Sequence, residues 1–253
     1  MIRLVSLNIE FNRHLDTVSA FLAKELPDVA CIQEIYEEHL TLFASALHGA
    51  SVSFAPITRH TEDVSHVLGT AIFSRLPIAD EGVHYYKGTP SSIPDMDSRD
   101  PRTFNNKNLQ ILRRDVVKDG ATFRIGTTHF SWTPDGMANE RQRTDIIAML
   151  NVLAPLGDII LTGDFNAPRG GEIWSEIAAR YKDNIPLHYK TSIDPNLHRA
   201  GSVKLVADAH AAGVPGHMVD GLFTTPHYNA ENVRLVSGAS DHMAVVADIH
   251  KAA

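Results

Sequence analysis

Polar residues stand at the ends of several apolar, strand-like segments of this chain, where a core strand has no need of them. They include carboxylates, amides and two imidazoles, and the candidates are Asn8, Glu34, His129, Asp164, Asn166, Asp220, Asp241 and His242. Strand ends in an α/β or sandwich fold can meet at one rim, which would bring these side chains together. Carboxylate and amide oxygens suit hard cations such as Mg²⁺ or Mn²⁺, which keep water and substrate phosphate as further ligands. The pattern therefore predicts a metal site suited to phosphate chemistry.

The elements that must position these residues alternate at the start of the chain. Residues 2–9 are expected to form a strand, followed by a helix with Asp16 as its N-cap. A buried strand at 29–33 and a second helix around 40–47 complete a β-α-β-α opening. Later strands are expected at 51–57, 70–74, 109–117, 122–128, 158–162, 219–224, 233–236 and 243–249. Many short strands with few helices favour sheet packed on sheet, with helices outside.

The clearest helix is predicted over residues 139–153, and a weaker one over 171–181. On the first, the apolar face is expected to hold Ile146, Ile147, Leu150 and Leu153, with Asp145 largely off it. The segment 85–107 contains three prolines and mixed charges, and we expect a long loop there.

Six short segments, in order along nearly the whole chain, resemble the endonuclease/exonuclease/phosphatase superfamily, which includes DNase I-like nucleases and inositol polyphosphate 5-phosphatases. The segments are Ser6-Leu7-Asn8, Ile32-Gln33-Glu34, Thr128-His129-Phe130, Gly163-Asp164-Phe165-Asn166, Val219-Asp220-Gly221 and Ser240-Asp241-His242. Each alone is compatible with a simple turn or strand end, whereas their common order makes chance a poor explanation. The resemblance implies an α+β, four-layer α/β/β/α sandwich of two mixed sheets, formed as a single domain over residues 1–253.

The resemblance also implies which residues hold a metal ion. Glu34 is similar to the principal metal carboxylate of the family, Asn8 supports it directly or through water, and Asp241 completes the site. The implied ion is Mg²⁺ or Mn²⁺.

The remaining candidates resemble the catalytic set. His242 matches the imidazole that acts as general base on the attacking water or contacts phosphoryl oxygens, and Asp220 matches its orienting carboxylate. Asp164 and Asn166 resemble the pair that positions the nucleophilic water and a phosphate oxygen. His129 resembles a second imidazole that stabilises charge in the transition state, although an edge histidine is the structural alternative.

Composition narrows the substrate class. The chain has 253 residues and a formal charge of −7, so it lacks the global basic field on which non-specific binding to duplex DNA relies. Its single cysteine, Cys31, excludes an internal disulfide and lies in an apolar run expected to be a buried strand. No signal-peptide pattern opens the chain and no apolar stretch approaches the ~20 residues of a transmembrane span, so a cytoplasmic location is expected.

The sequence therefore predicts a metal-dependent hydrolase of phosphoesters, with a small or exposed substrate favoured by the acidic charge. The alternative is a nuclease acting on DNA ends or lesions, which would be favoured by a basic face formed by Arg59, Arg75, Arg99, Arg102, Lys107, Arg113 and Arg114. A rival from another class is a binding module that has lost activity. Trp132 is either a stacking surface for substrate or a core residue. The oligomeric state is left open.

Overall fold

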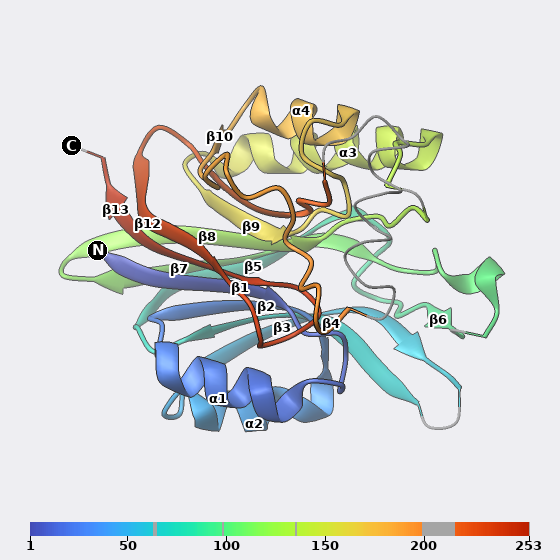
Figure 1. Ribbon diagram of the computed structural model, residues 1–253, viewed down its shortest axis with the longest axis horizontal. Helices are drawn as coiled ribbons and strands as arrows, with labels where there is room; N and C mark the ends of the chain where they lie inside the picture. The colour runs from blue at the N-terminus through green and yellow to red at the C-terminus, as the bar shows by residue number, and fades with distance from the viewer. Residues whose placement is uncertain (63–64, 98, 135, 199–215, 253) are drawn as a thin grey trace.

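The computed structural model describes residues 1–62, 65–97, 99–134, 136–198 and 216–252. Two mixed β-sheets pack face to face in the middle of the molecule, and helices cover both outer faces (Figure 1). The four helices named here are α1 (Leu15–Glu25), α2 (Leu40–Ala46), α3 (Glu140–Leu153) and α4 (Glu172–Ala178). Short 3₁₀ turns lie at Glu37–His39, Pro101–Thr103 and Ala154–Leu156. The expected α/β/β/α sandwich is confirmed.

The first sheet has seven strands, and both chain ends contribute to it. Their order is β12 (Tyr228–Val236), β13 (Ala244–Lys251), β1 (Ile2–Asn8), β2 (Val29–Tyr36), β4 (His66–Ser74), β3 (Ser51–His60) and β6 (Asp95–Met96). The β1–β2 and β3–β6 pairs are parallel, and the others are antiparallel. Because β1 and β2 are parallel and adjacent, their carboxyl ends lie at the same edge.

The second sheet has six strands and repeats this feature. Their order is β10 (Lys182–Asp183), β11 (Asp220–Thr224), β9 (Ile160–Asp164), β8 (Ala121–His129), β7 (Leu109–Lys118) and β5 (Ile78–Lys87). Strands β8 and β9 are its parallel pair, and β11 runs antiparallel to β9, so β11 begins where β9 ends. This arrangement gathers three strand termini at one edge.

The alternation of side chains on each strand divides the core into two parts. On β1, Leu4 belongs to the cluster between the sheets, whereas Val5 packs with the helices α1 and α2 on the outer face. On β2, Cys31 is likewise in the inner cluster and Ala30 in the outer one. Successive strand residues point to opposite faces, so a strand covered on both sides is apolar throughout. The prediction that Cys31 is a core residue is confirmed.

The inner layer is not wholly apolar. The Gln33 side chain donates to Thr127 Oγ1 of the opposite sheet at 3.0 Å, and also approaches Ser6 Oγ at 3.3 Å. These three side chains are fully or almost fully buried. They connect β2, β8 and β1 immediately below the strand ends, where polar side chains must hydrogen-bond to one another because water is excluded.

Several predicted boundaries are wrong. Helix α1 begins at Leu15 after His14, so Asp16 is in the first turn and is not the N-cap. On α3, Ile147 is 62% exposed, whereas Asp145 is buried on the core-facing side. A helix turns by about 100° per residue, so the buried face of α3 is a stripe that includes Asp145, Ile146 and Met149 and leaves Ile147 outside it. Asp145 is accommodated there because its carboxylate accepts a hydrogen bond from Ser131.

The expected loop at 85–107 is wrong in part. Its first residues complete strand β5, and β6 and a 3₁₀ turn lie within it. Strand β5 was missed because it is the edge strand of the second sheet, where much of its length is exposed and apolar residues are sparse. The exposed Asp80 and Glu81 illustrate this composition.

Candidate active site

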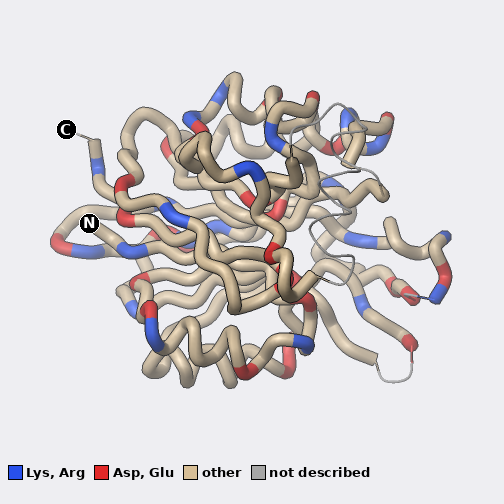
Figure 2. The backbone as a smooth tube through the Cα atoms, in the orientation of Figure 1, with Lys and Arg blue, Asp and Glu red and all other residues tan. Residues whose placement is uncertain are grey.

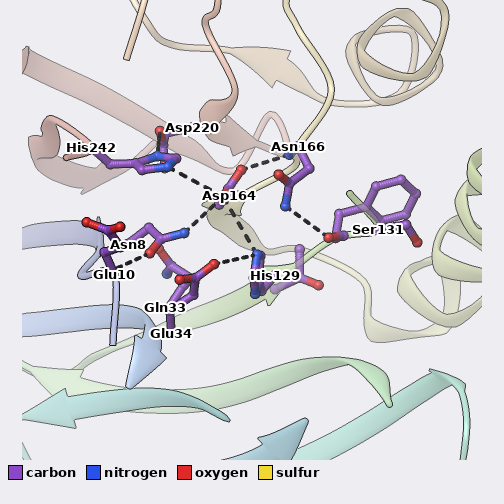
Figure 3. Close-up of polar contacts among 12 residues, drawn as sticks. Asn8, Glu10, Gln33, Glu34, His129, Ser131, Asp164, Asn166, Asp220 and His242 are labelled. Atoms are coloured by element: carbon purple, nitrogen blue, oxygen red, sulfur yellow. Dashed lines mark hydrogen bonds and ion pairs between the residues drawn. The ribbon is translucent and has the colours of Figure 1, made fainter. Parts of the chain in front are cut away.

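The candidate residues meet where the parallel pairs of the two sheets end. Asn8 at the end of β1 is paired with Gln33, which lies in the irregular part of β2, and His129 is paired with Asp164 at the ends of β8 and β9. Asn8 Nδ2 donates to Asp164 Oδ2 at 3.0 Å, which links the two sheets directly. Figure 3 shows Asp164 at the centre, with contacts to Asn8, His129 and His242.

A carboxylate–imidazole pair lies on one side of Asp164. His242 Nδ1 is 2.7 Å from Asp220 Oδ2, and its Nε2 is 4.0 Å from Asp164 Oδ2. All three side chains are buried. Burial lowers the pKa of His242, but the adjacent Asp220 and Asp164 carboxylates outweigh it and hold this pKa well above its ordinary value. These carboxylates therefore favour the protonated form of the imidazole, whose Nε2 faces Asp164.

The second imidazole has the opposite electrostatic character. His129 Nε2 lies 3.4 Å from Glu34 Oε1 and 3.7 Å from Asp164 Oδ2. Burial, reinforced by the nearby Lys107 ammonium, lowers the pKa of His129 to about 3. The surroundings of the two imidazoles thus act in opposite directions, because they favour the neutral form of His129 and the protonated form of His242. Such divergent environments are typical of groups with separate acid, base or binding roles.

Glu34 reaches the site through an irregularity in its strand. The register of β2 against β4 shifts between Ile32 and Ile35, and Glu34 has a φ of 55°. A bulge of this kind re-aims a side chain, and a left-handed backbone costs free energy in a residue other than glycine. Burial, with the Asp241 carboxylate as the next cause, raises the pKa of Glu34 to about 7. Burial and the neighbouring carboxylates thus outweigh the nearby Lys107 and His242, and the charged form of Glu34 is destabilised.

Asn166 lies on the turn that follows β9. Its backbone N–H donates to Asp164 Oδ1 at 2.8 Å, and its side-chain Nδ2 donates to the Phe130 carbonyl at 3.1 Å. The residue has a φ of 48°, a conformation that asparagine tolerates better than most residues. The turn thus holds both Asp164 and the Asn166 amide. Burial raises the pKa of Asp164, so this central carboxyl has an increased affinity for a proton.

Asp241 lies beside two residues that sequence reasoning missed. Ligand atoms of Glu10, His14 and Asp241 lie within 4.8 Å of one another. Ser240 Oγ donates to Asp241 Oδ1 at 3.1 Å, and the Asn8 side-chain oxygen accepts from the Glu10 backbone N–H at 3.1 Å. The local signal for Glu10 was its position two residues after Asn8, at the same strand end. His14 precedes the first residue of α1 and has no such signal.

A basic side chain on the opposite side also belongs to this group. Lys107 is close enough to Glu34 and Asp164 for their carboxylates to favour its charged form, although burial lowers its pKa. Two further polar residues of this segment are engaged elsewhere. Arg102 is exposed and paired with Asp100 at 2.7 Å. Asn106 donates to the backbone carbonyl of Asp95 in β6 at 3.2 Å. Lys107 is therefore the cation that faces the site from this segment.

The basic face that would favour the nuclease alternative is not formed by the residues named for it. Six of the seven contact acidic side chains: Arg59 with Asp95, Arg75 with Asp28, Arg99 with Asp97, Arg102 with Asp100, Arg113 with Asp80 and Arg114 with Glu81. Arg113 and Arg114 are also buried. Figure 2 shows basic and acidic positions interspersed over the chain. A long polyanion therefore has no continuous basic track on these residues.

The four-layer sandwich with polar strand ends at its rim is of the DNase I-like class. The chain matches the model of the endonuclease/exonuclease/phosphatase family over residues 5–242 and belongs to that family. No curated protein matches it in sequence.

Solved structures agree with the fold. The endonuclease/exonuclease/phosphatase from Bacteroides vulgatus has a TM-score of 0.69 at 17% identity, with 99% of each chain covered. The human Nocturnin catalytic domain with bound sulfate anion has a TM-score of 0.69 at 16% identity, covering 99% of this chain and 94% of that one. The mannosyl-6-phosphatase of Bacteroides thetaiotaomicron has a TM-score of 0.67 at 14% identity, with coverage of 99% and 100%. Among the residues described, no helix has the length and apolar character needed to cross a membrane.

Proposed function

We propose that this protein is a Mg²⁺- or Mn²⁺-dependent phosphoesterase that hydrolyses a phosphomonoester or phosphodiester on a small or exposed substrate. The observation that carries the proposal is the convergence of buried acids and imidazoles around Asp164. Family membership supports it, because family members are in general phosphoester hydrolases.

The donor set fits a divalent cation. Glu34, Asp241 and the side-chain oxygen of Asn8 are the proposed ligands, and Glu10 extends the set. A hard cation takes such oxygen ligands. The raised pKa of Glu34 supports the assignment, because a buried carboxylate beside other carboxylates is relieved by positive charge. When bound, the ion would supply charge that offsets the negative charge of the reacting phosphate and favours ionisation of water.

The residues around Asp164 suit in-line hydrolysis. Asp164 and the Asn166 amide would orient a water molecule, whose oxygen bonds to phosphorus while the opposite P–O ester bond breaks. The water proton would pass to Asp164, whose raised pKa suits it as an acceptor. The departing oxygen takes a proton from solvent.

His242 has two candidate roles, and its environment favours one. An imidazolium paired with Asp220 donates a hydrogen bond from Nε2 to a phosphoryl oxygen and stabilises charge in the transition state. The alternative role as general base requires the neutral ring. His129, neutral at neutral pH, is proposed to donate to a second oxygen of the same group.

An activity screen tests the proposal. The purified protein with Mg²⁺ or Mn²⁺ is expected to hydrolyse bis-p-nitrophenyl phosphate or a member of a phosphoester panel, and chelation with EDTA to abolish the reaction. His242→Ala and Glu34→Ala are each expected to remove most turnover while far-ultraviolet circular dichroism stays unchanged. No hydrolysis across the panel would refute the proposal and favour a non-catalytic binding module.

The nuclease alternative has its own test. Single-stranded, nicked and abasic DNA would be incubated with the protein and separated on denaturing gels. Cleavage of DNA at a higher kcat/KM than the best small phosphoester would reverse the preference. We expect the opposite, because the basic residues that would hold DNA are paired with acids.

A further inference from the structure

A hollow in the surface adjoins the proposed catalytic residues His242 and Asn166. Its volume is about 220 Å³, and His242 and Asn166 form the wall that it shares with the site. The other described residues that line it are Trp132, Thr133, Pro134, Gly136, Ile193, His198, His217 and Val219. A substrate whose phosphate contacts His242 would therefore place its organic part at this hollow.

The lining is uncharged apart from its imidazoles. None of the described lining residues is an aspartate, glutamate, lysine or arginine. The Trp132 side chain is 44% exposed, so the core alternative for it is wrong. Phe104 contacts the indole edge-on, with ring centroids 6.5 Å apart and an interplanar angle of 69°. An exposed indole held by a second ring offers a flat apolar face to a ligand.

Thr133 supplies an independent sign of a ligand. Its side chain lines the hollow and the residue is only 4% exposed, yet within the described part of the chain its Oγ1 has no hydrogen-bond partner. A buried hydroxyl without a partner costs free energy, so native proteins seldom retain one without a reason. A ligand hydroxyl at this position would satisfy it.

We propose that this hollow is a specificity pocket for the uncharged sugar ring of a sugar phosphate. This inference rests on the proposed function. A monosaccharide has an apolar C–H face that packs on an indole and a rim of hydroxyls that pairs with Thr133 and imidazoles. The volume supports a single small ring, because it is below the ~300 Å³ at which pockets for drug-sized ligands begin. A whole nucleoside is therefore disfavoured.

Substrate preference is the first test. Initial rates with Mn²⁺ would be compared for glucose 6-phosphate, mannose 6-phosphate, adenosine monophosphate and glycerol 3-phosphate, which has no ring. We expect kcat/KM for at least one hexose phosphate to exceed that for glycerol 3-phosphate about tenfold, the ratio that corresponds to one good stacking contact. A preference for the nucleotide, or no preference for any ring, would overturn the proposal.

Two substitutions locate the preference. Trp132→Ala is expected to reduce the ratio of kcat/KM between hexose phosphate and glycerol 3-phosphate about tenfold, and Trp132→Phe to restore most of it. Thr133→Val is expected to raise KM for hexose phosphate two- to tenfold, on the order of one lost hydrogen bond, with little change in kcat. Its melting temperature should not fall, because the hydroxyl has no partner to lose. Leu187→Ala, at a side chain 75% exposed and outside the lining, is the matched control.

A binding readout separates this inference from the proposed function. The chain has two tryptophans, and Trp174 is 2% exposed, so a sugar should alter the fluorescence of Trp132 preferentially. Methyl glucoside is expected to shift the emission of the wild type and not of Trp132→Ala. If no phosphoester is cleaved but this shift occurs, only the catalytic proposal fails. If phosphoesters are cleaved with an unchanged ratio in Trp132→Ala, only the sugar pocket fails.

Discussion

Glu34→Gln is expected to stabilise the metal-free protein while removing its activity. The rise in the pKa of Glu34 from 4.5 to about 7 corresponds to a penalty of about 3 kcal/mol for the charged side chain. Glutamine has the same shape without the charge. The substitution should therefore raise the free energy of unfolding above pH 7 by up to about 3 kcal/mol.

The sign of the pH dependence follows from the two pKa values. Below pH 4.5 the carboxyl is protonated in both folded and unfolded states, so the charge imposes no penalty. Between pH 4.5 and about 7 the unfolded chain loses the proton first, and the stability of the wild type falls relative to Glu34→Gln. Above about pH 7 the difference reaches its full size.

Urea denaturation in EDTA at pH 4 and pH 8 measures this difference directly. Glu37→Gln, at an exposed position, is the control and should change little at either pH. Added Mn²⁺ should then raise the melting temperature of the wild type and have little effect on Glu34→Gln, because a ligand is lost. A variant that is less stable than the wild type at pH 8, or equally stabilised at both pH values, would refute the reasoning.

Three further predictions concern the surroundings of the site. Asp220→Asn removes the carboxylate that raises the pKa of His242, so the alkaline loss of kcat/KM should begin at lower pH; an unchanged alkaline limb would contradict the imidazolium role. Gly163→Ala should lower the free energy of unfolding by about 2 kcal/mol or more in urea, because φ is 139° and a Cβ would lie 2.0 Å from the Thr128 carbonyl oxygen; full stability would show that the strands separate easily. Arg114→Ala should cost about 3 kcal/mol or more in the same assay, since the buried Ile72 carbonyl and the part-buried Ser51 carbonyl lose their donor; a loss below 1 kcal/mol would mean that water replaces it.

The strand ends of the site were predictable because their signal is local. An apolar run that stops at a polar residue is visible at Asn8, Glu34, His129 and Asp164, and the structure brings these four together. The helix pattern around Ile146 likewise predicted α3 to within one residue at its start. Such features depend on the repeat of side chains along a helix and on their alternation along a strand, and both patterns are set by residues close together in the sequence.

Other features depend on contacts between distant parts of the chain, which local patterns do not specify. One such feature is whether a charged side chain has an ion-pair partner. Arg113 and Arg114 suggested a basic face, but the packing of β5 against β7 buries them and pairs them with acidic side chains. Another is His14, which approaches Asp241 only because α1 packs outside the first sheet near the chain's other end.

The residue types at the strand ends thus indicated the class of chemistry from the sequence alone. Each carboxylate, amide or imidazole could be recognised there as a candidate site residue. The tertiary structure decided their charge states and their surroundings. Burial lowers the pKa of His129 to about 3, whereas the Asp220 and Asp164 carboxylates raise that of His242, although both histidines lie close to strand ends. The same packing leaves the Thr133 hydroxyl without a partner in the described structure, beside an exposed indole. The pKa shifts of the two histidines and the unpartnered Thr133 hydroxyl arise from burial and from distances between residues of the two sheets. Local sequence patterns specify neither burial nor these distances.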